Sequence, residues 1–252
     1  MSLQGNLATE ERLDRLTRHL REHGRVVIGA AAVELGVSEM TIRRDLKELE
    51  ARGTLKRVRG GALAVGPQPF ADRRRTAARA KAAIATKLAG LVPATGAVAF
   101  DASSTIMRLA GSLPDVRDLV VLTNGPDTFA ALHDMPGVRA MLTGGEREPR
   151  TGSLVGPLAC RSAGQLGVER LFLSAAALDL TLGATETCLE EAEVKRAMRA
   201  SAGQVVLAVD ASKLDGRAVA VSLDWDAIDV LVTDLAPDDD RLAAYRDRVE
   251  VR

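Results

Sequence analysis

Two hydrophobic patterns divide this chain of 252 residues. In the first part, apolar side chains recur with helical spacing and predict helices over residues 11–22, 28–35 and 38–52, with Gly53 ending the third. From residue 97 onward, short apolar runs alternate with helical stretches. The patterns therefore predict a small helical domain followed by a larger domain of mixed helices and strands.

The third predicted helix has the features of a helix that reads DNA. Its apolar residues Ile42, Leu46 and Leu49 share one face. Ser38 is suited to cap its start, because a serine hydroxyl accepts a hydrogen bond from an amide of the first turn. The residues expected to contact DNA from this segment are Ser38, Thr41, Arg43, Arg44 and Lys47. A short helix with one packed side and one arginine-bearing side fits the major groove of double-stranded DNA.

The segments on either side complete a winged helix-turn-helix. Gly36 and Val37 are expected to form the turn that leads into the third helix. Residues 55–62 predict a two-stranded wing, whose Arg57 and Arg59 would touch phosphates or a minor groove. The alternative is an amphipathic helical domain with solvated arginines, which leaves the joint occurrence of turn, cap, arginine pair and wing unexplained.

This segment also resembles a known family. Residues 41–46 read T-I-R-R-D-L, and residues 49–62 read L-E-A-R-G-T-L-K-R-V-R-G-G-A. Both are similar to the DNA-binding domain of DeoR-type bacterial transcriptional regulators, and the resemblance covers roughly residues 10–62. It implies that the small domain binds operator DNA.

The larger part of the chain has the pattern of a parallel sheet. Its predicted strands are residues 97–100, 119–122, 138–142, 171–173, 205–209 and 230–232. Runs that are apolar on both faces and separated by helices indicate a parallel sheet covered on both sides, so we expect a Rossmann-like α/β domain. Ligands of such sheets bind beyond the carboxyl ends of the strands.

Polar or small residues follow five of these strands. The candidate ligand-binding residues are Asp101, Ser103, Ser104, Thr105, Thr123, Asn124, Gly144, Gly145, Asp179, Lys195, Asp210 and Lys213. Hydroxyls and free amides at a helix start suit a phosphate, glycines let the backbone approach a ligand, and lysines add positive charge. The carboxylates are expected to accept hydrogen bonds from hydroxyl groups, because they would repel phosphate. The sequence therefore predicts a small-molecule cleft.

The order of these motifs resembles the effector domain of DeoR-type regulators. D-A-S-S-T, T-N, T-G-G-E, L-V-G-P, E-E-A-E-V-K-R-A-M and D-A-S-K follow one another over roughly residues 76–236. The resemblance implies a fold like that of sugar-phosphate isomerases and coenzyme A transferases, and a phosphorylated sugar or related metabolite as inducer. The chain departs from the family at Ser103, where glycine is usual, and at Ala177, in a segment that lacks the usual glycine.

Charge is distributed unevenly although the chain is neutral overall. Residues 1–82 contain 17 Lys and Arg against 10 Asp and Glu, whereas residues 83–252 contain 17 against 24. A basic first part suits a polyanion, and an acidic remainder confines DNA contact to the small domain. Aromatic residues make up only 2% of the chain, which disfavours base-stacking recognition of single strands or RNA.

Other features of the sequence bear on the cellular compartment and on membrane or metal binding. Cys160 and Cys188 are the only cysteines, and they form no metal-binding or redox motif. No run approaches the roughly 20 apolar residues that span a bilayer, and the N-terminus lacks an apolar signal core. We expect a cytoplasmic protein with no membrane contact, no cofactor and no metal.

A ligand-controlled transcriptional regulator, most often a repressor in this family, is the leading interpretation. A homodimer or homotetramer is expected, because paired recognition helices bind paired half-sites. One alternative is a sugar-phosphate isomerase-like enzyme, in which Asp101, Asp179, Glu191 and Lys213 would do acid–base work. Another is a regulator that has lost its effector site through the departures at Ser103 and Ala177.

The domain boundaries give a first prediction. We expect a DNA-binding domain over residues 1–62, a linker over 63–75 and an effector domain over 76–252, because Gly66, Pro67 and Pro69 resist regular structure. Limited proteolysis followed by mass spectrometry should cut first between residues 64 and 75. A first cut within residues 97–232 would contradict these boundaries.

Overall fold

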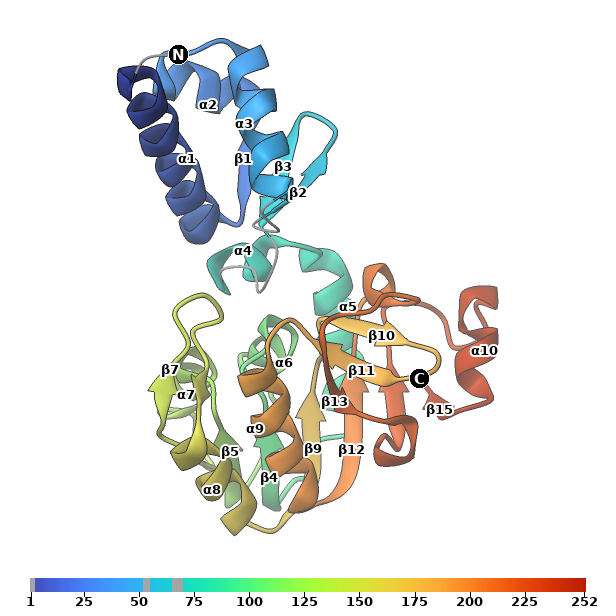
Figure 1. Ribbon diagram of the computed structural model, residues 1–252. Helices are drawn as coiled ribbons and strands as arrows, with labels where there is room; N and C mark the ends of the chain where they lie inside the picture. Colours follow the sequence, from blue (N-terminus) through green and yellow to red (C-terminus); the bar gives the residue numbers. More distant parts are fainter. Residues whose placement is uncertain (1–2, 52–54, 65–69) are drawn as a thin grey trace. The chain divides into compact units, whose positions relative to one another are not determined.

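The computed structural model describes residues 3–51, 55–64 and 70–252 (Figure 1). Gly53, expected to end the third helix, and the Gly66–Pro69 segment of the expected linker lie outside these ranges. The chain divides into two compact units, residues 1–73 and 74–252. Within the described ranges, no helix is both long enough and apolar enough to cross a membrane.

Within the smaller unit, residues 3–51 and 55–64 form three helices and a three-stranded antiparallel sheet. Its elements are α1 (Leu3–His23), β1 (Arg25–Val27), α2 (Ile28–Leu35), α3 (Glu39–Ala51), β2 (Leu55–Val58) and β3 (Gly61–Ala64). Leucines of α1, the apolar side of α3 and Val26 of β1 form its core. The predicted winged helix-turn-helix is confirmed, and β1 adds a third strand to the wing that the sequence did not suggest.

Two glycines make the wing possible. Gly60 turns the chain between β2 and β3 with φ at +84°. A Cβ atom at Gly61 would lie 2.0 Å from the carbonyl oxygen of Val26, so β1 can pair with β3 only when residue 61 has no side chain. The Gly-Gly pair of the motif therefore has one residue for the turn and one for strand contact.

The larger unit is built on a seven-stranded parallel sheet with the order β15-β14-β12-β9-β4-β5-β6. In that order the strands are Glu250–Val251, Val230–Val232, Ala202–Ala208, Val168–Leu173, Gly96–Phe100, Leu119–Thr123 and Val138–Leu142. All six predicted strands are present. The short edge strand β15 is the one that the sequence did not suggest.

Successive residues of the central strands serve two separate cores. Val98 and Phe100 pack on one face with α5 (Ala78–Ala89) and α6 (Ser104–Ala110). Ala99 packs on the other face, with α8 (Pro157–Gln165) and α9 (Leu189–Ala200). The predicted parallel sheet, buried on both sides, is therefore confirmed.

Shorter elements complete the larger unit. Its remaining helices are α7 (Pro126–Leu132) and α10 (Ala243–Arg246), with 3-10 turns at Ala211–Lys213, Trp225–Ala227 and Asp240–Leu242, and helix α4 (Phe70–Arg75) spans the boundary between the two units. Two small antiparallel sheets join β10 (Ala177–Asp179), β11 (Gly183–Glu186) and β13 (Ala220–Leu223), and β7 (Glu146–Arg147) with β8 (Leu154–Val155). The sequence did not predict these sheets, because their strands are too short for a clear alternation.

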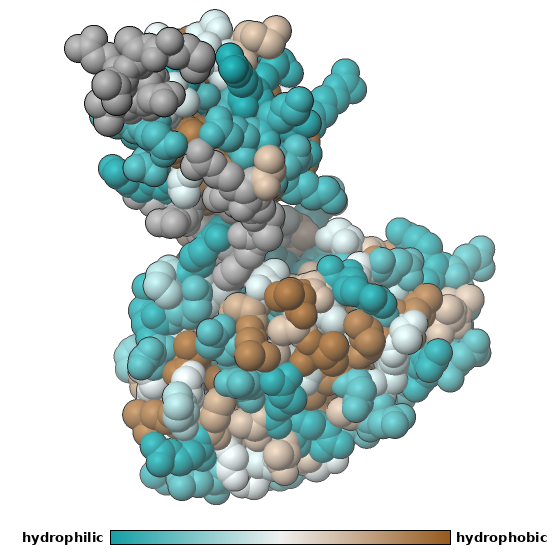
Figure 2. Space-filling model, in the orientation of Figure 1, coloured by the Kyte–Doolittle hydropathy of each residue, from teal (hydrophilic) through white to brown (hydrophobic). Residues whose placement is uncertain are grey.

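Apolar side chains also reach the surface of the larger unit. Figure 2 shows them gathered on the face that is turned to the viewer. The large hydrophobic residues exposed in this unit are Leu142, Leu158, Leu189, Val219 and Val221.

The expected linker contains regular structure at both ends. The wing continues to Ala64, two residues past the expected end of the small domain. Helix α4 occupies residues 70–75, where the guanidinium carbon of Arg73 lies 5.2 Å from the centre of the Phe70 ring. The basic run that the sequence shows here is therefore part of a helix.

An ion pair between α1 and α3 of the smaller unit is largely withdrawn from solvent. Nε and Nη2 of Arg12 donate to the Asp45 carboxylate at 2.5 and 3.0 Å, and the Asp45 side chain is 4% exposed. Asp45 is the aspartate of the T-I-R-R-D-L motif, so this residue ties α3 to α1 and does not face outward. Breaking such a pair leaves an uncompensated charge in the protein.

We expect Asp45→Ala to destabilise the smaller unit by about 3 kcal/mol, because Arg12 would lose its partner. Hydrogen exchange of the α3 amides is the measurement, since it reports on one unit of a two-unit chain. The control is Glu11→Ala, which breaks the exposed Glu11–Arg15 pair and should change stability by about 0.5 kcal/mol or less. Equal effects of the two substitutions would contradict the assigned role of Asp45.

Candidate functional site

The recognition helix presents the surface that its sequence predicts. The Ser38 hydroxyl accepts from the Thr41 amide at 3.1 Å and lies 2.9 Å from the Thr41 hydroxyl, which fixes the start of α3. Ile42, Leu46 and Leu49 are buried. Arg43, Arg44 and Lys47 are exposed. The helix thus has a packed side and a basic side, as a groove-binding helix requires.

Acidic residues hold two of the candidate arginines in place. Arg43 pairs with Glu39 one turn earlier on α3, at 3.3 Å. Nε of Arg57 donates to Glu50 at 2.6 Å and the Arg57 amide donates to the same carboxylate at 2.8 Å, which links the wing to α3. These hydrogen bonds from Arg57 lower the pKa of Glu50. The wing and the recognition helix therefore form one connected surface.

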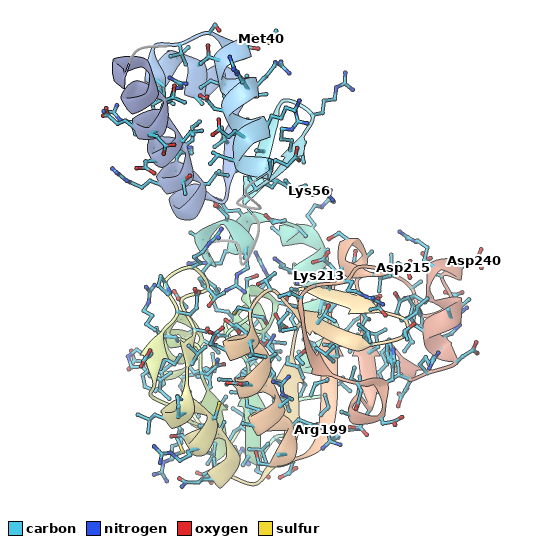
Figure 3. The ribbon with its side chains drawn as sticks, in the orientation of Figure 1. Met40, Lys56, Arg199, Lys213, Asp215 and Asp240 are labelled. Atoms are coloured by element: carbon cyan, nitrogen blue, oxygen red, sulfur yellow. The ribbon has the colours of Figure 1, made fainter. Side chains whose placement is uncertain are left out.

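Two further residues of this surface were absent from the sequence-based prediction. Met40 on α3 is 73% exposed, and Figure 3 shows it pointing outward from the smaller unit. Lys56 of β2 also extends into solvent. Arg59 next to the wing turn is exposed as expected. The basic character of the surface continues from the helix into the wing.

In the larger unit, Asp101 organises the ends of two neighbouring strands. It is fully buried directly after β4. Its carboxylate accepts hydrogen bonds from the amides of Ser103 and Ser174, each at 3.0 Å, and Ser174 directly follows β9. The sequence predicted that these strand ends would meet, and the structure places them together.

Lys195 lies at the centre of the same polar group. Its Nζ atom lies 3.1 Å from Asp101 and donates to Glu186 at 2.6 Å and to the Ser174 carbonyl at 2.7 Å. Burial alone would lower the pKa of Lys195, but the charges of Glu186, Asp101 and Glu191 outweigh it and raise the pKa. Lys195 was expected to face a ligand, whereas these contacts direct it to protein acceptors.

A second buried lysine reaches the hydroxyl-rich loop. Lys81 of α5 is 3% exposed, and its Nζ donates to the Ser104 hydroxyl at 3.0 Å and to the Thr76 carbonyl at 2.9 Å. The sequence-based prediction missed this residue. Its signal was present, because Lys81 falls on the same helix face as Ile84, Ala85 and Leu88, a position where an apolar residue is usual.

Residues 103–105 form the start of α6 as expected. The Ser103 hydroxyl accepts from the Ile106 amide at 3.2 Å and caps the helix. Ser103, Ser104 and Thr105 are all buried. The Ser103 side chain is thus compatible with the loop at a position where the family usually has glycine.

Thr123 ends β5, and Asn124 directly follows the strand. The Thr123 hydroxyl accepts from the Gly125 amide at 3.0 Å, and the Asn124 side-chain amide donates to the Leu154 carbonyl at 3.1 Å. The Oδ1 atom of Asn124 is buried and has no hydrogen-bond partner among the described residues. The same is true of the Ser174 hydroxyl. Buried polar atoms of this kind usually have a partner, so each one calls for an explanation.

The two glycines after β6 have different roles. A Cβ atom at Gly145 would lie 2.5 Å from the carbonyl oxygen of Val155, so this glycine is required by packing. At Gly144 the nearest heavy atom, in the Leu158 side chain, would lie 3.7 Å away. Packing alone therefore explains the glycine at position 145, without a ligand close to the backbone.

Helix α9 brings a further carboxylate to the polar group. Glu191 lies one turn before Lys195 and accepts from the Ser153 hydroxyl at 2.5 Å, and Ser153 lies 2.9 Å from the Thr151 hydroxyl. Burial, together with the charge of Glu191, raises the pKa of Glu186, although Lys195 acts in the opposite direction. Glu186, Ser153 and Thr151 were missed by sequence reasoning, because they follow none of the predicted strands.

Three candidates have other neighbours. The Asp179 carboxylate accepts from Arg217 at 2.8 Å and from two backbone amides, and these hydrogen bonds lower its pKa to about 2. Asp210 accepts from the Ser212 amide at 3.1 Å. Lys213, labelled in Figure 3, donates to the Ala175 carbonyl, and its charge acts on Glu186. Lys213 thus borders the polar group, whereas Asp210 is bound within its own turn and Asp179 is engaged within the small sheet.

Comparison with known proteins agrees with this two-part organisation. Residues 12–68 match the DeoR-like helix-turn-helix domain, and residues 76–235 match the DeoR C terminal sensor domain. Among solved structures, the chain is distantly similar to the translation initiation factor eIF-2B of Pyrococcus horikoshii OT3, at 11% identity and a TM-score of 0.44 over 64% of this chain and 65% of that one. It is also similar to ribose 5-phosphate isomerase A of Methanocaldococcus jannaschii, at 13% identity and a TM-score of 0.38 over 53% of each chain.

Curated relatives are similar over most of their length. The transcriptional repressor AccR of Agrobacterium fabrum is 33% identical over 232 residues, 90% of each chain. The transcriptional regulator GlpR of Haloferax volcanii is 35% identical over 79% of this chain and 80% of its own. A putative aga operon transcriptional repressor of Escherichia coli O157:H7 is 29% identical over 94% and 91%. These matches show that the chain belongs to the DeoR family and is a DNA-binding transcriptional regulator, not an enzyme.

Proposed function

We propose that this regulator represses a carbohydrate-metabolism operon and is released from its operator by a phosphorylated sugar or a related metabolite. The observation that carries the proposal is the buried contact between Lys81 and Ser104 beside the ends of β4 and β9. A buried cation next to hydroxyl groups suits an anion such as phosphate. Repression is the mode we propose, because several relatives are named repressors.

We assign DNA contact to the basic surface of the smaller unit. Arg43 and Arg44 would contact bases and phosphates in the major groove, and Arg57 and Arg59 would contact the backbone through the wing. Ser38, Thr41 and Lys47 belong to the same surface. A homodimer or homotetramer in the cytoplasm would place two recognition helices on two operator half-sites.

We assign the effector phosphate to the loop over residues 103–105, with Lys81 as its main cation and Lys213 as a second. Asn124 and Asp210 would accept hydrogen bonds from sugar hydroxyls. Asp179 is left out of this set, because its carboxylate already binds Arg217. Lys195 would position the residues around the site and would not contact the ligand, since Asp101, Glu186 and Ser174 take its hydrogen bonds.

A retained effector site is favoured over a lost one by two buried atoms. Asn124 Oδ1 and the Ser174 hydroxyl have no partner among the described residues, and both side chains are at most 2% exposed. Such atoms cost free energy unless something binds them. A ligand that donates and accepts hydrogen bonds would supply the missing partners.

We expect Arg44→Ala to weaken operator binding by about 1–3 kcal/mol, if Arg44 makes a bidentate contact to guanine. Arg57→Ala should weaken binding to all sequences about equally and reduce its dependence on salt, because it would remove a phosphate contact. Fluorescence anisotropy with operator and non-operator duplexes at several salt concentrations measures both effects.

Arg15→Ala is the matched control for these variants, since it removes an exposed arginine from α1, whose partner is Glu11. Its operator affinity should equal that of the wild type apart from a small general charge effect. Unchanged operator affinity in both Arg43→Ala and Arg44→Ala would rule out the assigned placement of the recognition helix.

We expect Ser104→Glu to abolish release from the operator while leaving operator binding intact. The new carboxylate would take the Lys81 ammonium and repel the phosphate. A thermal-shift screen of phosphorylated sugars identifies a compound that binds, and anisotropy of operator DNA in its presence measures release. The unphosphorylated compound should bind far more weakly than its ester.

Ser112→Glu is the control for this variant, because Ser112 is exposed near the other end of α6. It adds the same charge and should respond to the effector as the wild type does. Release of Ser104→Glu at the wild-type effector concentration would show that the phosphate binds elsewhere.

A further inference from the structure

Three buried carboxylates surround one ammonium group in the larger unit. Asp101, Glu186 and Glu191 are 0%, 6% and 6% exposed, and Lys195 is 5% exposed. Asp101 and Glu186 are both within 3.1 Å of the Lys195 ammonium. Glu191 follows the same face of α9 and receives its hydrogen bond from Ser153. Asp101, Glu186 and Glu191, here called the carboxylate group, lie directly after β4, at the end of β11 and on α9.

Hydrogen-bond donors are too few for the acceptors of this group. Lys195 has three N–H bonds, and its three contacts are with Asp101, Glu186 and the Ser174 carbonyl. Within the part of the chain that the structure describes, the hydrogen bonds of Glu186 and Glu191 use only Oε1 of each residue. The second oxygen of both carboxylates therefore has room for a donor.

Two independent atoms point to a ligand at this place. The Ser174 hydroxyl and Asn124 Oδ1 are buried without a partner among the described residues. Ser174 belongs to the group through its backbone, which binds Asp101 and Lys195. The Asn124 side-chain amide donates to the Leu154 carbonyl. Leu154 directly follows Ser153, whose hydroxyl donates to Glu191. Most of the open positions are acceptors, so the matching ligand brings donors.

The opposite chemistry is found at the Lys81–Ser104 contact, where a cation and hydroxyl groups suit an anion. The two places therefore carry opposite charge. The start of α6 offers hydrogen-bond donors, and Glu186 and Glu191 offer acceptors. Burial raises the pKa of Glu186. The excess of negative charge comes from the geometry, because three carboxylates, those of Asp101, Glu186 and Glu191, share the one ammonium of Lys195. A second anionic end on the ligand would add to that excess.

We propose that the carboxylate group binds the hydroxyl-bearing end of the effector, opposite its phosphate, and excludes a ligand that ends in a carboxylate. The effector is then a phosphorylated polyol or neutral sugar, and the phosphorylated sugar acid of the same length is rejected. This inference rests on the proposed function, which places the phosphate at Lys81 and Ser104. Like charges brought together in a buried site repel strongly, so the expected preference is about 100-fold or more.

Matched ligand pairs test the inference on the full-length wild-type protein. The pairs are erythritol 4-phosphate with erythronate 4-phosphate, ribitol 5-phosphate with ribonate 5-phosphate, and glucitol 6-phosphate with gluconate 6-phosphate. Each pair differs only in a hydroxymethyl or carboxylate group at the end remote from the phosphate. Isothermal titration calorimetry should show that at least one polyol phosphate binds and that its acid partner binds about 100-fold or more weakly.

A variant with one negative charge removed tests whether Glu191 causes the preference for the polyol phosphate over the acid. Glu191→Gln keeps an oxygen that can accept from Ser153 but removes one negative charge, so the preference should fall to about tenfold or less. Glu193→Gln, on an exposed position of the same helix, is the control and should keep the wild-type preference. The comparison of ligand pairs on the wild type stands even if Glu191→Gln does not fold.

The outcomes separate this inference from the proposed function. If an acid and its polyol bind with equal affinity, the phosphate assignment survives and the role of the carboxylate group is wrong. If Glu191→Gln folds and keeps the full preference, Glu191 does not read the ligand and the inference is also wrong. If none of the six phosphate esters binds, the phosphate assignment fails and the inference fails with it.

Discussion

The ammonium group of Lys195 joins three segments that are far apart in the sequence. It contacts Asp101 after β4, the Ser174 carbonyl after β9 and Glu186 of β11. A buried ammonium is tolerated only when its hydrogen bonds are satisfied, so these partners are fixed relative to one another. Asp101 extends the arrangement by binding the amides of Ser103 and Ser174. The loop over residues 103–105, to which we assign the effector phosphate, therefore depends on the contact between Lys195 and Asp101.

The smaller unit uses charge in a comparable way. Asp45 points inward to Arg12, whereas Arg43 and Arg44, its neighbours in the same motif, point to solvent. Helical periodicity explains the difference, because Asp45 lies three residues after Ile42 and shares its buried side. One motif therefore combines a buried structural aspartate with two arginines exposed to solvent. Glu50 then fixes Arg57 and joins the wing to the recognition helix.

The fold and the candidate DNA-binding surface could be predicted to a large extent from local patterns. The three helices of the smaller unit and six strands of the parallel sheet follow from periodicity, since each buries a regular face or run. The short strands β1, β7, β8, β10, β11, β13 and β15 could not be predicted in this way. Their pairing depends on distant partners and on close backbone approach, as at Gly61 beside Val26.

The sequence by itself determined the order of the domains, the family resemblance, the basic helix and the polar character of the strand ends. Only the tertiary structure decided which polar residues meet. Lys81 was hidden on an apolar helix face, Glu186 followed no predicted strand, and Asp179 matched the pattern but binds Arg217. The physical reason is that secondary structure follows the periodicity of neighbouring residues, whereas a buried charge is placed by partners supplied from elsewhere in the fold.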